Sequence, residues 1–157
     1  MSLKAHSRQT NRQGDGTVDQ TKIFAPFIGV MLLTLVVWLY MYARRLPYII
    51  TSKLTPQQLT PAEFARLSPP QVANPSDNLK NLFELPAVFY AVALYVYLTH
   101  QVDTPYLIAA WVFLGFRILH SLVHCTFNYV PLRFWLYAIS ALALWLMVLR
   151  IAVAVLF

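Results

Sequence analysis

Residues 23–43 form an apolar run that contains no charged side chain. Its length is close to the ~20 residues that a helix needs to cross the hydrocarbon core of a bilayer. Arg44 and Arg45 follow directly, at the point where the chain would return to water. The run therefore predicts a helix that spans a membrane, and the rest of the chain has to be compatible with that placement.

Three further apolar stretches predict helices at about residues 78–99, 105–127 and 132–155. Their uniform apolarity differs from the alternating, roughly ten-residue strands of a membrane β-barrel. The whole chain is 59% hydrophobic and 11% charged, whereas soluble domains have about 25% charged residues. We predict an all-α, integral membrane four-helix bundle over residues 23–157.

Polar segments connect or precede these spans. Residues 1–22 lack the pattern of a signal peptide and predict a flexible polar tail. Residues 44–77 predict a long loop, in which Thr60, Pro61 and Glu63 have the order of a capped helix start. We therefore expect a short helix near residues 60–67, on the membrane surface.

The distribution of charge predicts the topology. The chain has 12 Lys and Arg against 6 Asp and Glu, a net charge of +6. The short turns at 100–104 and 128–132 make neighbouring spans antiparallel, so the long loop 44–77 and the second turn share one side. That side is the more basic one, which favours a cytoplasmic long loop with both termini outside. No basic stripe with interleaved aromatic residues remains for nucleic acid, so we expect no nucleic-acid partner.

Ionisable side chains within membrane helices are costly and are therefore candidates for function. Asp77, Asn81 and Glu84 share one helical face, and Lys80 precedes Glu84 by four residues and is spaced to pair with it. Such residues could bind the polar groups of a ligand. They could equally hydrogen-bond neighbouring helices and fix the bundle.

The third and fourth spans carry a second polar group. Arg117, His120 and His124 share one face, and Arg117 can bind a carboxylate through two N–H groups. The two histidines could ligate a metal or a haem, but the local sequence lacks further ligands, and we assign no metal-binding residue. Arg133 and Tyr137 lie one turn apart and suit a thiol-activating or anion-binding pair. The alternative is a snorkelling arginine beside an interfacial tyrosine.

Two motifs in this four-span arrangement resemble a known family. Residues 81–84 (NLFE) are closely followed by Pro86, and residues 117–120 read RILH. Together they resemble the MAPEG family, the membrane-associated proteins of eicosanoid and glutathione metabolism. The resemblance covers residues 23–157 and is closest to the little-characterised bacterial branch.

The resemblance implies a homotrimer that crosses a bacterial inner membrane and binds glutathione, as a co-substrate, between protomers near the cytoplasmic side. It also implies a glutathione-dependent transferase or peroxidase acting on lipophilic small molecules that arrive from the lipid bilayer. Arg133 and Tyr137 would be its catalytic residues. The glutathione-binding residues would be Lys80, Asn81, Glu84, Arg117 and His120.

One position departs from the family pattern R-x-x-x-N-x-x-E, because Asp77 stands where the arginine is expected. Lys80, near the same face, could supply the missing cation. Alternatively, the chain is a non-catalytic trimeric membrane protein that has lost glutathione binding. A third alternative is a haem-binding or metal-binding membrane protein that uses His120 and His124.

Overall fold

The computed structural model describes residues 18–157, which form helices joined by turns and contain no strand. The helices are η1 (Gln20–Ile23), α1 (Phe24–Ser52), η2 (Pro56–Leu59), α2 (Pro61–Leu67), α3 (Pro70–Asn81), α4 (Leu85–Leu98), α5 (Thr104–Cys125) and α6 (Val130–Leu156). Four units are long and apolar enough to cross a membrane: η1 with α1, α3 with α4, α5, and α6. The predicted all-α fold with four spans is confirmed.

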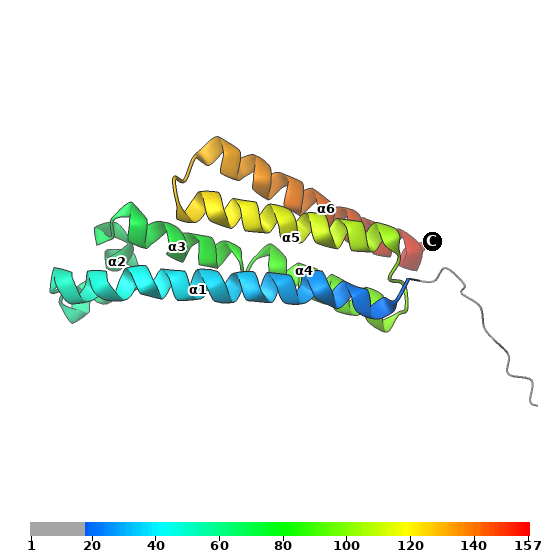
Figure 1. Cartoon of the computed structure of the whole chain (residues 1–157), viewed down its shortest axis with the longest axis horizontal. Coiled ribbons are helices and arrows are strands. Elements are labelled where there is room, and N and C mark those ends of the chain that lie inside the picture. Colours follow the sequence, from blue (N-terminus) through cyan, green and yellow to red (C-terminus); the bar gives the residue numbers. More distant parts are fainter. Residues whose placement is uncertain (1–17) are drawn as a thin grey trace, which may run out of the picture.

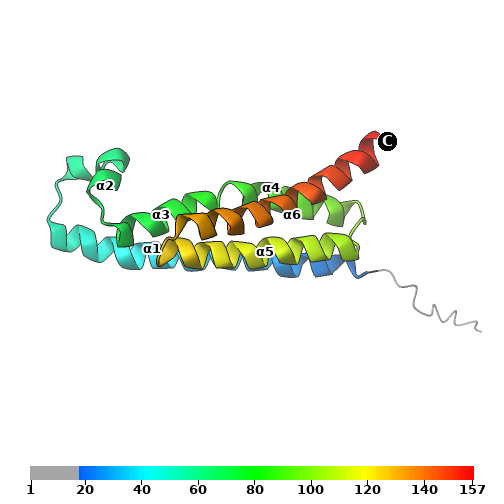
Figure 2. The same ribbon diagram turned by 90° about the horizontal axis from the view of Figure 1, so that it is seen from above.

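The spans form an elongated bundle in which α1 lies along α3 and α4, and α5 pairs with α6 (Figure 1). Seen from above, α6 diverges from α5 toward its C-terminal end (Figure 2). Phe89 of α4 and Phe113 of α5 stack in the buried core with ring centroids 4.6 Å apart. Gly29 allows α1 to approach α5, because a Cβ atom there would lie 2.5 Å from Leu114 Cδ2.

The first span continues as a helix well past its predicted end, so the prediction of a loop from residue 44 is wrong. An arginine pair ends an apolar run but favours helix, and α1 runs on to Ser52. The short helix expected near 60–67 is α2, and it packs against this extension. The Tyr48 hydroxyl donates to the Leu67 carbonyl at 2.7 Å, and the Arg45 guanidinium lies 4.3 Å from the centroid of the Phe64 ring.

The second span also differs from its predicted bounds of 78–99. It begins as α3 at Pro70, where a proline at the first helical position loses no helical hydrogen bond. It is then interrupted at residues 82–84. Pro86 explains the interruption, because it has no N–H for the Leu82 carbonyl and its ring displaces that carbonyl. The bounds of α5 and α6 differ from the predicted ones by about two residues, the usual uncertainty at helix ends.

The tail predicted over residues 1–22 falls mostly outside the described residues. Its last part, residues 18–22, is instead placed against the bundle, with η1 beginning at Gln20, which corrects the prediction of a tail there. The Asp19 carboxylate caps η1 by accepting from the Thr21 backbone N–H at 2.9 Å. The Gln20 side chain donates to the Val102 carbonyl at 3.0 Å and accepts from the Val102 N–H at 2.8 Å. These two bonds fix the start of the first span to the α4–α5 turn.

Candidate functional site

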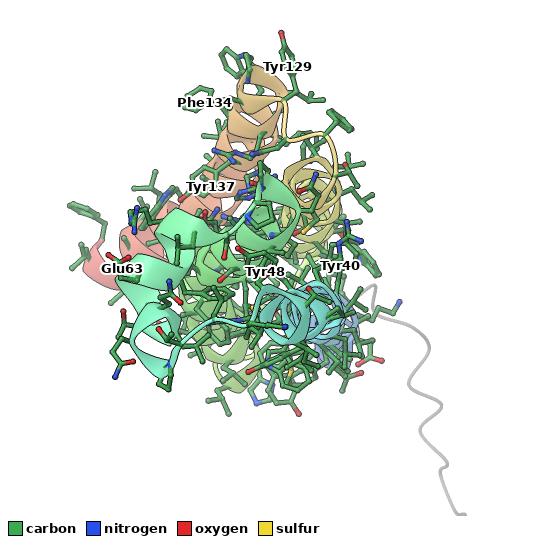
Figure 3. All side chains as sticks on the ribbon, turned by 90° about the vertical axis from the view of Figure 1, so that its left-hand side faces the viewer. Tyr40, Tyr48, Glu63, Tyr129, Phe134 and Tyr137 are labelled. Atoms are coloured by element: carbon green, nitrogen blue, oxygen red, sulfur yellow. The ribbon has the colours of Figure 1, made fainter. Side chains whose placement is uncertain are left out.

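A small cavity lies where the interruption between α3 and α4 faces α5 and the start of α6. Its volume is about 200 Å³, and it is lined by Asn81, His120, Val130, Arg133, Phe134 and Tyr137. The start of α6 is on the same side of the molecule as α2 (Figure 1). Viewed from that side, Tyr129 and Phe134 lie at the outer edge, whereas Tyr137 lies deeper in the bundle (Figure 3). The cavity thus has an apolar outer rim and polar inner walls.

Arg117 is completely buried in α5 beside these residues. Its Nη1 group donates to the Asn81 carbonyl at 3.5 Å, and its guanidinium carbon lies 4.6 Å from the centroid of the Tyr137 ring. The Asn81 carbonyl is at the C-terminus of α3, where the helix dipole attracts a cation. The Nε and Nη2 groups of Arg117 are buried without a partner among the described residues. A buried cation with unused donors is suited to an anionic ligand.

His120, one turn along α5, is held by the backbone of α6. Its Nδ1 atom lies 3.0 Å from the Arg133 carbonyl. A carbonyl can only accept, so Nδ1 carries the hydrogen in this contact. The Nε2 atom is buried without a partner among residues 18–157. The ring centroid of His120 lies 5.8 Å from that of Tyr137, so the imidazole and the phenol form neighbouring walls of the site.

Arg133 and Tyr137 reach the cavity from the first turns of α6. The short turn after α5 makes α6 fold back along α5, and this brings both side chains to Arg117 and His120. The structure therefore brings together five of the predicted site residues: Asn81, Arg117, His120, Arg133 and Tyr137.

Buried hydrogen bonds between α3 and α5 hold these two helices together beside the site. Asn78 is fully buried, and its Nδ2 group donates to the Cys125 sulfur at 3.5 Å. The Ser121 hydroxyl donates to Asn78 Oδ1 at 3.4 Å. Interhelical bonds of this kind are typical of packed membrane helices and hold α3 in register with α5.

Glu84 stands apart from this cluster. It occupies the position before the first residue of α4, it is exposed, and its side chain does not cap the helix. Its neighbour Phe83 is 68% exposed. The interruption of the second span therefore presents a carboxylate and an aromatic ring on the outside of this single chain.

Comparison with protein families decides the assignment. The model of the MAPEG family matches residues 23–153. The chain belongs to the MAPEG family. Comparison with curated proteins and with solved structures found no match.

The position at which this MAPEG chain departs from the family pattern forms a local ion pair. Lys80 Nζ lies 2.8 Å from Asp77 Oδ1, and both side chains are more than half exposed. The expected pairing of Lys80 with Glu84 is wrong, because four-residue spacing aligns two side chains only on a continuous helix and α3 ends at Asn81. Lys80 does not line the cavity, and its charge is balanced by Asp77.

His124 packs against His120 with ring centroids 5.6 Å apart. Within residues 18–157, no three His, Cys, Asp or Glu side chains are grouped in a way that would hold a metal ion. His120 also uses one ring nitrogen on the Arg133 carbonyl. The two histidines therefore pack against each other within α5, and only His120 forms a hydrogen bond to α6, while His120 Nε2 and His124 Nδ1 have no hydrogen-bond partner among the described residues.

Two residues at this site were missed by the sequence analysis, Asn128 in the α5–α6 turn and Asn74 of α3. Arg133 Nη1 donates to Asn128 Oδ1 at 2.7 Å, and Asn128 Nδ2 donates to Asn74 Oδ1 at 3.2 Å. An asparagine just after a helix indicates a turn, but its partner 54 positions away leaves no periodic signal in the sequence.

Proposed function

We propose that this MAPEG protein is a glutathione-dependent transferase or peroxidase that acts on lipophilic electrophiles. The observation that carries the proposal is the buried Arg117 guanidinium, with its unused Nε and Nη2 donors, beside a cavity walled by Arg133 and Tyr137. Glutathione is an anionic peptide with a thiol, so its carboxylates can bind Arg117 and its sulfur can lie beside Arg133 and Tyr137. The family membership and the apolar outer rim of the cavity support the same proposal.

The chemistry requires a thiolate, because a free thiol has a pKa of about 8.5 and is mostly protonated at neutral pH. In our proposal the Arg133 guanidinium and the Tyr137 hydroxyl stabilise the thiolate, and they are the catalytic residues. Arg117 and His120 bind the peptide, with Asn81 and Glu84 orienting it. In a transfer reaction the thiol proton goes to solvent, sulfur bonds to the electrophilic carbon, and the leaving group departs with its electron pair.

We further propose that the protein acts as a homotrimer. Exposed Glu84 and Phe83 lie in the middle of the second span unit, Pro70–Leu98. A carboxylate facing lipid would be costly, so a neighbouring subunit is the natural cover for this surface. Chemical cross-linking in membranes should give a ladder that ends at three subunits, and a ladder that ends elsewhere would contradict the trimer.

The test of the proposed activity is titration calorimetry of the detergent-solubilised protein with glutathione, together with an assay of conjugation to an aryl halide. We expect binding and turnover in the natural sequence, and loss of turnover in Arg133→Ala. Arg66→Ala is the matched control, because Arg66 is an exposed arginine paired with Glu63 in α2, outside the spans. No binding heat and no conjugation in the natural sequence would refute the proposal.

A second candidate function is favoured by one observation. Lys80, the cation nearest to the position of the missing family arginine, is paired with Asp77. A MAPEG protein with that charge balanced could keep the fold as a trimeric membrane protein without binding glutathione. Asp77→Arg distinguishes the two candidates. If the natural sequence has lost glutathione binding, this variant should gain it. If the natural sequence already binds glutathione, the variant creates no new binding.

We also propose that the protein lies in a bacterial inner membrane with its long loop in the cytoplasm. The resemblance of residues 76–90 and 117–128 to the bacterial branch of the family supports placement in a bacterial inner membrane. The positive-inside rule supports a cytoplasmic long loop. Arg44, Arg45 and Lys53 lie in the extension of α1 and just after it, on that side.

A further inference from the structure

The turn between α5 and α6 has an unusual backbone. Asn128 has a φ of 49°, in the left-handed region that glycine favours and that asparagine tolerates better than most residues. Its backbone N–H donates to the Val123 carbonyl at 2.8 Å and closes the end of α5. Lys53 and His100 are the other non-glycine residues with positive φ in the described part of the chain. Backbone shape alone would be satisfied by glycine at each of the three positions.

The side chain of Asn128 forms two hydrogen bonds that glycine could not form. Its Oδ1 atom accepts from Arg133 Nη1 at 2.7 Å. Its Nδ2 group donates to Asn74 Oδ1 at 3.2 Å. A guanidinium has only donors, so the amide oxygen has to face Arg133 and the amide nitrogen has to face Asn74. The carboxamide is therefore oriented by partners on both sides, one on α6 and one on α3.

Arg133 is consequently held at two points before any ligand arrives. Its carbonyl is bonded to His120 of α5, and its Nη1 group is bonded to Asn128. Arg133 lines the cavity, whereas Asn128 does not. Of the guanidinium N–H groups of Arg133, only one on Nη1 is bonded to another of residues 18–157, so the others are available to a ligand.

We propose that Asn128 is a positioning residue that fixes the guanidinium of Arg133 toward the cavity, with Asn74 fixing Asn128 in turn. The proposal rests on the proposed function in one respect, because the anion that Arg133 would meet is the glutathione thiolate. A donor that is already oriented stabilises a developing charge without reorganising during the reaction. Asn128 thus affects the thiolate through Arg133 and does not touch the sulfur itself.

The test compares three variants of the full-length protein in detergent. Asn128→Gly keeps the left-handed backbone and removes the carboxamide. Asn128→Asp keeps an acceptor for Arg133. His100→Gly makes the same kind of backbone change at another left-handed position. It is the control, because the His100 side chain makes no hydrogen bond to another described residue. We expect both glycine variants to fold, with a lower melting temperature in Asn128→Gly because it loses two side-chain hydrogen bonds.

The catalytic readout is the pH dependence of thiolate formation in bound glutathione, followed by ultraviolet absorbance, with kcat and KM measured separately. We expect Asn128→Gly to raise the pH at which the thiolate forms and to lower kcat about tenfold with little change in KM, as for loss of a hydrogen bond to a charged group. Asn128→Asp should hold the guanidinium but leave thiolate formation impaired, because its carboxylate balances the positive charge of Arg133. His100→Gly should match the natural sequence. An unchanged pH profile and kcat in Asn128→Gly would overturn the proposal.

A second readout needs no glutathione and separates this inference from the proposed function. In side-chain NMR of isotope-labelled arginine, the Arg133 guanidinium, assigned by its loss in Arg133→Lys, should show hindered rotation in the natural sequence and in His100→Gly. It should rotate freely in Asn128→Gly. If glutathione does not bind but this difference is seen, the proposed function fails and the positioning role stands. If the Arg133 signals are the same in Asn128→Gly, the positioning role is wrong.

Discussion

Arg117 carries a charge that is buried together with two unused donors, Nε and Nη2. Its contacts with the Asn81 carbonyl and the Tyr137 ring offset only part of the cost of burying this charge, and in our proposal an anionic ligand offsets the rest. We predict that Arg117→Met keeps or raises the melting temperature while it weakens glutathione binding by about tenfold or more. Thermal unfolding and titration calorimetry measure the two effects on the same sample.

The matched control for this prediction is Arg150→Met. Arg150 of α6 forms a two-bond ion pair with Asp103, one bond of which is 2.7 Å long, and it does not line the cavity. Its loss should lower the melting temperature slightly and leave glutathione binding unchanged. A fall in the melting temperature of Arg117→Met as large as in Arg150→Met would show that Arg117 has a structural role instead.

Asp103 gives a prediction about pH. It lies in the α4–α5 turn outside the spans, and the hydrogen bond from Arg150 is the main cause that lowers the pKa of its carboxyl group below the ordinary value. In the unfolded chain the pKa is about 3.9. The stabilisation is therefore complete above that pH and is lost as the pH falls through the lower pKa of the folded state.

We expect Asp103→Asn to be less stable than the natural sequence near neutral pH, by at most about 1 kcal/mol because the pair is partly exposed. The difference should shrink as the pH is lowered below about 4, where the natural carboxylate also becomes protonated. Unfolding followed across this pH range measures it. A stability difference that stays constant with pH would contradict the assigned role of the ion pair.

At the scale of the helices, Pro86 determines the shape of the second span. We predict that Pro86→Ala joins α3 and α4, because residue 86 gains an N–H for the Leu82 carbonyl. The Asn81 carbonyl would then accept from the Leu85 N–H, and its contact with Arg117 Nη1 would be lost. We expect slower hydrogen exchange at residues 84–87 and weaker glutathione binding.

Pro47→Ala is the control for this prediction, since α1 already continues through Pro47. It should change neither hydrogen exchange at residues 84–87 nor binding. Rapid exchange at residues 84–87 that persists in Pro86→Ala would mean that the interruption has another cause.

The sequence predicted the four spans well because apolar length is a strong signal that depends on no contact. It failed where tertiary contacts decide the structure. In the extension of α1, for example, Tyr48 packs against Phe64 of α2 and donates to the Leu67 carbonyl. Helix α3 was missed because its prolines suggested a loop, although Pro70 stands where a helix tolerates proline.

The same distinction applies within the candidate site. The spacing of Arg117 and His120 placed them on one face, and the short turn after α5 brought Tyr137 to them. Asp77 and Lys80 are spaced for an i,i+3 pair within α3, but the sequence analysis paired Lys80 with Glu84 because it took the helix as continuous. No spacing rule indicated that Asn128 would hold Arg133, because that contact depends on a left-handed turn.

At the scale of the whole molecule, the topology can be tested with single cysteines. Cys125 is the one cysteine of the chain, so Cys125→Ser gives a cysteine-free background. In intact cells, a membrane-impermeant maleimide should label Gln101→Cys and leave Lys53→Cys unlabelled until the cells are permeabilised. The reverse pattern would place the long loop outside and overturn the proposed orientation.

The two arginines of α6 are separated by a distance close to the thickness of the hydrocarbon core of a bilayer. Arg133 at the cavity and Arg150 at Asp103 are about 26 Å apart along the helix, at 1.5 Å per residue. A bilayer with a thicker hydrocarbon core would draw one of these charges inward or require the helix to tilt. We therefore expect a change in lipid thickness to act on both ends of α6 and, through Arg133, on the residues that line the cavity.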